Sequence, residues 1–223
     1  MEHGAVRPLN FSGRRISAEY VEAVKCFEVT GRAIVVNTGY HPALVAEQPR
    51  LGIPPLKSTI LQDAVVENAD GLVVLRVDES LGIEGIVGEP GWEMFFPGLW
   101  KSPQDLLGFN GGHPVKVNLW FAPAGTDCRI HNLHEFLEVH TQVHGIGRMQ
   151  KFRAQDHGTL YEDAPLAPGS THEPFCVTGP DGTYRYPWHQ YRADTDCVWL
   201  AVEYHPAETH PAGDPVVETR KEG

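Results

Sequence analysis

Residues 125–144, GTDCRIHNLHEFLEVHTQVH, constrain the fold more than any other stretch, because they place four histidines and two glutamates in a short, strongly patterned run. From position 137 onward, polar and mostly aliphatic side chains alternate. The polar positions are the even ones: Glu138, His140, Gln142 and His144. An alternation of period two predicts a β-strand with one polar face. Imidazole is a good ligand for divalent metals, so this face is more typical of a metal site than of a solvated surface.

A second strand is expected just before this one. Residues 115–121 are apolar, and Pro123, Ala124 and Gly125 then form a turn signal. The two runs together predict a β-hairpin. A carboxylate on the inner face, such as Glu138, needs a cation or a proton, because an unpaired buried charge is costly. The pattern therefore favours a metal ion bound on this hairpin.

The spacing of these residues resembles the first metal-binding motif of the cupin superfamily. Gly125 is followed after five residues by His131, then by His134, by Glu138 after three residues, and by Gly145 after six. Downstream, residues 167–172, APGSTH, resemble the second cupin motif. The resemblance implies an antiparallel jelly-roll barrel, that is, a double-stranded β-helix. It also implies a metal held by four ligands: His131, His134, Glu138 and His172.

The chain departs from the family pattern in both motifs. Two residues separate His131 from His134, where the family has one, and Cys176 stands where the family has Asn. In a regular strand the two histidines would point to opposite faces, so a bulge or the start of the strand must lie between them. Either His131 or His140 therefore completes the ligand set.

The implied cofactor is one divalent transition metal. Iron is the first choice, with manganese, nickel, copper and zinc as alternatives, because three imidazoles and a carboxylate suit all of them. On the same face of the strand, His140 and Gln142 are the expected catalytic residues, which orient the substrate or transfer protons. Further along, an aromatic and basic cluster at residues 184–191 supplies the expected substrate-binding residues: Arg185, Trp188 and His189.

Three functions follow from the resemblance. The leading one is a cupin-like metalloenzyme that acts on a small organic metabolite as a non-haem, metal-dependent oxygenase of the dioxygenase type. The second is a redox-neutral isomerase, lyase or cyclase that uses the ion as a Lewis acid. The third is a non-catalytic cupin that only binds a small molecule.

Composition excludes several other classes of protein. The formal net charge is −11, so nucleic acid and anionic membranes are not expected partners. Neither a long apolar run nor an export signal is visible, which predicts a cytoplasmic protein. The four cysteines form no CxxC pair and are expected to be reduced.

The remaining segments complete the expected architecture, which is mainly β. Residues 1–110 are expected to form an extension of strands, loops and a short helix that packs on the barrel without being an independent domain. The helix is expected at residues 16–27, and strands at 33–36 and 71–77. Residues 111–206 are expected to form the barrel, and 207–223 a polar tail. The aromatic side chains of residues 82–112 plug the barrel, line its mouth or form a subunit contact, the last of which suggests a homodimer.

Overall fold

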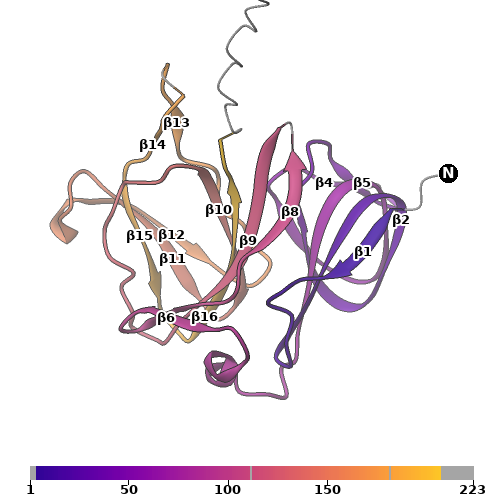
Figure 1. Ribbon diagram of the computed structural model, residues 1–223, viewed down its shortest axis with the longest axis horizontal. Coiled ribbons are helices and arrows are strands. Elements are labelled where there is room, and N and C mark those ends of the chain that lie inside the picture. The colour runs from indigo at the N-terminus through magenta and orange to yellow at the C-terminus, as the bar shows by residue number, and fades with distance from the viewer. Residues whose placement is uncertain (1–3, 111, 181, 207–223) are drawn as a thin grey trace, which may run out of the picture.

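A computed structural model describes residues 4–110, 112–180 and 182–206, and these residues form two β-rich halves that pack side by side (Figure 1). The first half contains β1 (Ala5–Pro8), β2 (Ile16–Asn37), β3 (Ala43–Val45), β4 (Leu51–Ile53) and β5 (Ser58–Val77). The second half contains β6 (Glu93–Phe96), β7 (Leu99–Lys101), β8 (Asp105–Asn110), β9 (His113–Ala122), β10 (Leu137–His144), β11 (Gly147–Phe152), β12 (Leu160–Leu166), β13 (Val177–Thr178), β14 (Tyr184–Arg185), β15 (Trp188–Ala193) and β16 (Cys197–Tyr204). Two short 3-10 helices lie between strands, η1 (Ile83–Gly88) and η2 (His157–Thr159).

The first half is one antiparallel sheet that curls back on itself. Its order is β1-β2-β5-β3-β4, and the long strands β2 and β5 pair along most of their length. Near the end of β2, Ile34 pairs with both Leu75 and Ile60 of β5, so the sheet closes around an apolar interior. Valines from both strands fill that interior, because β-branched side chains pack well on a pleated surface.

The helix expected at residues 16–27 is wrong, because these residues belong to β2. Ala18 and Tyr20 are buried against the second half, whereas Val21 and Val24 are buried inside the first. Between the two valines, Ala23 adopts a left-handed backbone with φ of 50°. The resulting spacing of three between buried residues imitates a helix in the sequence. By contrast, the strands expected at 33–36 and 71–77 are confirmed.

The second half is an antiparallel jelly roll made of two sheets packed face to face. One sheet has the order β10-β16-β9-β7-β6, with β8 also paired to β9, and the other has the order β12-β11-β15. Trp199 and Ala122 of the larger sheet share a core with Met149 and Tyr191 of the smaller one. The predicted fold class, a mainly antiparallel β jelly-roll barrel with additional N-terminal strands, is confirmed.

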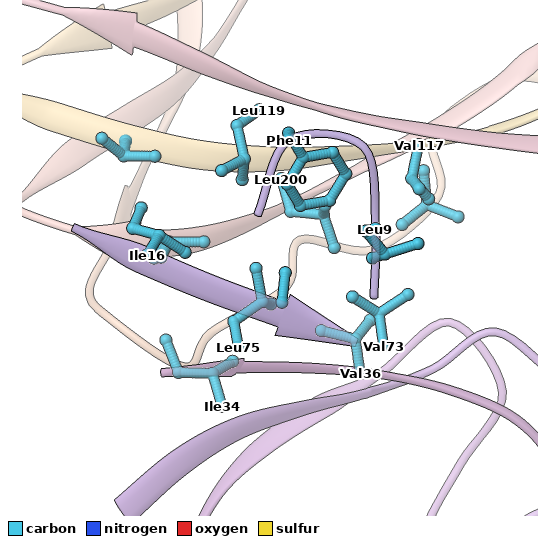
Figure 2. Packing of buried hydrophobic residues seen from close by; sticks show 14 of the residues in the cluster. Leu9, Phe11, Ile16, Ile34, Val36, Val73, Leu75, Val117, Leu119 and Leu200 are labelled. Atoms are coloured by element: carbon cyan, nitrogen blue, oxygen red, sulfur yellow. The ribbon is translucent and has the colours of Figure 1, made fainter. Parts of the chain in front are cut away.

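A third core joins the two halves. In Figure 2, Ile34, Leu75 and Ile16 from the first half lie opposite Leu119, Leu200 and other side chains of β9 and β16. Because side chains alternate along a strand, the opposite face of β9, β10 and β16 is free to line the interior of the jelly roll. The candidate site lies on that inner face.

The segment before residue 111 contributes to the jelly roll as well. Strands β6, β7 and β8 all pair into its larger sheet. From this segment, Trp92 and Trp100 pack on the core between the halves, while Phe95 and Phe96 line a cavity of the jelly roll. The domain division and the dimer remain predictions, and the tail at 207–223 lies outside the described residues. In the described ranges, we find no helix with the length and apolar character needed to cross a membrane.

Candidate metal centre

Three histidine side chains meet at one point on the inner face of the jelly roll: His131, His134 and His189. The Nε2 atom of His134 lies 2.9 Å from Nε2 of His131 and 3.1 Å from Nε2 of His189. The possible ligand atoms of the three residues all lie within 4.8 Å of one another. The structure therefore brings two of the expected ligands together with a histidine expected to bind substrate.

Backbone pairing positions two of these histidines. His131 and His189 form an isolated antiparallel bridge, with N–H···O distances of 2.9 and 2.8 Å, so their side chains project from neighbouring strands to the same side. The residue two positions before His131, Arg129, has φ of 64°, which turns the chain into this bridge.

His134 reaches the same point because the chain between the bridge and β10 is irregular. Residues 132–136 form no ladder pairs, and regular pairing begins at Leu137 with Tyr204. The irregularity required by the two-residue spacing between His131 and His134 is thus present. Tyr186 fixes this segment, since its hydroxyl donates to the carbonyl of Phe136 at 2.9 Å and accepts from the N–H of Glu138 at 2.8 Å.

Hydrogen bonds on the far side of the rings define which nitrogen faces the cluster. Nδ1 of His131 lies 2.9 Å from the carbonyl of Arg129, and Nδ1 of His189 lies 2.9 Å from the carbonyl of Pro187. A carbonyl only accepts, so each Nδ1 carries the proton, and each Nε2 of the neutral ring presents a lone pair. If Nε2 of His134 carries a proton, it can donate to Nε2 of His131 or to Nε2 of His189, but not to both.

His134 and His189 are neutral at ordinary pH, as ligands must be. Burial lowers the pKa of His134 to about 4, an effect that Glu138 partly opposes. Burial likewise lowers the pKa of His189 to about 3. Neutral rings with converging lone pairs repel one another unless a cation lies between them.

The spacing of the nitrogens fits a metal ion. Two nitrogens bound at about 2.0–2.1 Å and at angles between about 90° and 109° are about 2.8–3.4 Å apart. The two Nε2–Nε2 distances from His134, 2.9 and 3.1 Å, fall in this interval. His131, His134 and His189 therefore fit a divalent transition metal, and their Nδ1 contacts to backbone carbonyls are the outer hydrogen bonds that commonly orient such ligands.

Glu138 lies beside the three histidines and is paired with another one. Its Oε1 is 3.0 Å from Nε2 of His140, and its Oε2 is 3.7 Å from Nδ1 of His134. Burial alone would raise the pKa of Glu138, but His140, followed by His134 and His172, lowers it to about 2. The carboxylate is thus ionised, and the opposite nitrogen of His140, Nδ1, is buried without a hydrogen-bond partner in the part of the chain that the structure describes.

The structure places His172 and Gln142 away from the three-histidine cluster. Nε2 of His172 accepts the backbone N–H of His140 at 2.9 Å, and its Nδ1 lies 2.9 Å from the carbonyl of Glu173. Both of its ring nitrogens are thereby engaged. Gln142 is fully buried, where its Oε1 accepts from the hydroxyl of Tyr191 at 2.5 Å and its Nε2 donates to the carbonyl of His144 at 2.7 Å.

Of the three expected substrate-binding residues, the structure brings only His189 to the cluster. Arg185 is exposed on β14, and Trp188 is half-buried at the start of β15, where it pairs with Phe152. Neither lines the cavity described below. His189 lies two residues before Tyr191 in β15, so the alternation of side chains along a strand puts both on the same face.

A cavity of about 740 Å³ opens beside the three histidines. Aromatic side chains form much of its wall, among them Phe96, Trp120, Tyr191 and Trp199. At its rim, the guanidinium of Arg129 lies 4.5 Å from the ring centre of Phe96. The volume suits a small organic molecule, and the aromatic wall would exclude water around it.

Comparison with solved structures finds cupin proteins. An RmlC-like cupin from Shewanella frigidimarina is 17% identical with a TM-score of 0.35, over 52% of this chain and 85% of its own. An ectoine synthase from P. lautus is 19% identical with a TM-score of 0.36, over 56% and 77%. A cupin 2 conserved barrel domain protein from Leptotrichia buccalis is 9% identical with a TM-score of 0.33, over 92% and 91%. Neither the protein-family models nor the curated proteins provide a match. At these TM-scores the likeness carries no argument about chemistry, which must come from the side chains.

Proposed function

We propose that this protein is a metal-dependent enzyme that acts on a small organic metabolite, and that its reaction is an oxygenation. The observation that carries the proposal is the convergence of three Nε2 atoms beside a cavity of about 740 Å³. His131, His134 and His189 would hold the ion. Three ligands leave coordination positions open, which is what a catalytic site requires and a structural site lacks.

When bound there, a redox-active ion such as iron would supply activation of dioxygen, for which three imidazoles are a suitable ligand set. The chain's own residues bind and orient the substrate. Trp120, Trp199 and Phe96 surround its apolar part and keep water out. Glu138 is ionised, so it can accept a hydrogen bond from a substrate group near the ligands and orient that group.

A redox-neutral reaction is the second candidate, and the Glu138–His140 pair favours it. The carboxylate lies 3.0 Å from Nε2 of His140, while Nδ1 of the same ring has no hydrogen-bond partner within residues 4–110, 112–180 and 182–206. A carboxylate and an imidazole in contact can take up a proton at one atom and release one at another. Such a pair suits isomerisation or elimination without dioxygen.

The test is an oxygen-electrode experiment on protein loaded separately with iron, manganese and zinc. Each form is mixed with a panel of small organic metabolites, and products are followed by mass spectrometry. We expect oxygen uptake with the iron form and loss of uptake in His134→Ala. The matched control is His41→Ala, because the side chain of His41 is 79% exposed in the first half of the chain.

Two results would count against the proposal. Product formation without oxygen uptake would overturn the oxygenation and support the redox-neutral reaction. Failure of the wild type to bind any of the three metals would overturn both.

A further inference from the structure

We propose that the cavity contains a second subsite, built from Glu203, Asn118 and Gln104, that binds a primary ammonium group of the substrate. The inference rests on the proposed function, since it takes this cavity to be the place where the substrate binds. It goes further by naming a substrate class, a small amine with an apolar body.

Asn118 carries an acceptor that the protein leaves unused. The residue is 3% exposed on the inner face of β9 and lines the cavity. Its Oδ1 is buried without a hydrogen-bond partner among the described residues. An unsatisfied buried acceptor is unfavourable, so a retained one indicates a donor supplied from outside the chain.

Glu203 presents a charged acceptor from the neighbouring strand. It is 7% exposed and also lines the cavity. Gln104 donates to its Oε2 at 3.0 Å, and Nε2 of His205 lies 2.8 Å from the same oxygen. Both contacts involve Oε2, so Oε1 remains for a ligand.

The sheet register places the two acceptors within reach of one group. Asn118 pairs with Ala201 and Lys116 pairs with Glu203, so Asn118 and Glu203 are diagonal neighbours on the same face. Diagonal neighbours in a sheet lie about 7–8 Å apart. Asn118 and Glu203 line the same cavity, and Ala201, which pairs with Asn118, adds only a methyl group beside them.

Charge favours a cation at this place over a neutral hydroxyl. Glu203 pairs directly with Glu138 of β10, and like charges placed opposite one another are destabilising. Burial, followed by Glu138, raises the pKa of Glu203 to about 7, while Lys116 and Lys101 act in the opposite direction. The ammonium of Lys101 is itself bound to Glu93 at 3.1 Å. An ammonium ligand brings positive charge and three N–H donors to these acceptors.

The apolar body of the ligand would lie on the aromatic wall. Tyr191 and Trp199 stack with ring centres 3.9 Å apart, and Trp120 stacks on Trp199 at 6.4 Å. All three rings line the cavity. They offer flat surfaces to an aryl or alkyl group, and also attract cations.

The test compares 2-phenylethylamine with 2-phenylethanol, a neutral molecule of nearly the same shape, by isothermal titration calorimetry at pH 8. Three samples are used: the wild type, Glu203→Gln and Glu135→Gln. The last is the matched control, since it removes an equal charge from an exposed position between His134 and Phe136, which line the same cavity. We expect the wild type to bind the amine at least about tenfold more tightly than the alcohol, as charge-assisted hydrogen bonds allow. Glu203→Gln should remove this preference and Glu135→Gln should retain it.

Asn118→Leu is a second variant, which removes the unused acceptor and keeps the volume. It should weaken amine binding without lowering stability, because no internal hydrogen bond is lost. Equal affinity of the wild type for amine and alcohol would overturn the subsite. So would a preference that survives Glu203→Gln but disappears in His134→Ala, because the amine would then be a metal ligand. Metal content measured on the same samples separates the two proposals. If the wild type binds no metal and still prefers the amine in a way that depends on Glu203, the ammonium subsite stands and the proposed metal-dependent function does not.

Discussion

At the scale of single residues, hydrogen bonds to the backbone decide which histidines can act as ligands. His131 and His189 each donate from Nδ1 to a carbonyl, and so present Nε2 to the cavity. His172 uses both nitrogens within the protein. The sequence alone does not separate ligand histidines from structural ones, because the difference lies in these hydrogen bonds to the backbone.

The hydroxyl of Tyr186 provides a test of how the segment before β10 is held. It donates to the carbonyl of Phe136 and accepts from the N–H of Glu138, so Tyr186→Phe leaves two polar backbone groups without a partner. We expect the free energy of unfolding to fall by about 1–3 kcal/mol. Urea denaturation measures it, with Tyr161→Phe as control because Tyr161 is 46% exposed. An equal effect of the two substitutions would argue against this role.

Glu203 predicts a pH dependence of stability. Its pKa is raised from 4.5 to about 7 by burial and by Glu138, so the folded protein binds more protons than the unfolded chain between these values. Stability therefore falls as the pH rises through this interval, and Glu203→Gln is free of the loss. The variant should be more stable than the wild type by about 2 kcal/mol at pH 8, with little difference at pH 5. Urea titrations at pH 5 and pH 8 measure the free energy of unfolding of both proteins. If the difference between variant and wild type were the same at the two pH values, the raised pKa of Glu203 would be contradicted.

At the scale of elements, the site depends on departures from regular strands. The chain from His131 to Phe136 leaves the ladder, and this is what lets two histidines separated by two residues meet. The tight turn between β10 and β11 then returns the chain to the smaller sheet. Gly145 forms this turn with φ of 74°, and a Cβ atom there would lie 2.1 Å from the carbonyl oxygen of Asp196.

Substitution of this glycine tests the turn. Gly145→Ala combines an unfavourable backbone conformation with a clash against backbone, and we expect a loss of more than about 2 kcal/mol in thermal or urea unfolding. Gly31→Ala is the control, because Gly31 has φ of 68° but open space around it. It should lose only about 1 kcal/mol. Similar losses for both variants would show that the close approach of Asp196 is unimportant.

Sequence patterns predicted the local parts of the site and missed the long-range one. Glu138 and His140 lie in one alternating run, so their position on one face of β10 could be predicted. His189 lies 55 residues after His134, and only the bridge between residues 131 and 189 brings them together. The wrong prediction of a helix at β2 also has a long-range cause. The face of β2 that is buried changes near Ala23, because the strand packs first on the core between the halves and then on the core of the first half.

At the scale of the whole molecule, the first half supports the jelly roll from outside. The core between the halves packs on the outer face of β9, β10 and β16, whose inner face carries the site. Ser58 of β5 also donates to the carbonyl of Gly169 at 2.8 Å and contacts the hydroxyl of Thr171 at 2.6 Å. These contacts hold the loop that leads to His172, and so fix the backbone beside His140.

Metal content tests the central claim most directly. The wild type, His189→Ala and His172→Gln would be purified without added metal, reconstituted in parallel and analysed for bound metal per chain. The account predicts close to one ion per chain in the wild type, a loss of at least about tenfold in His189→Ala, and retention in folded His172→Gln. Retention of the ion in His189→Ala together with its loss in folded His172→Gln would contradict the account and return the ligand set to the one implied by the cupin motifs.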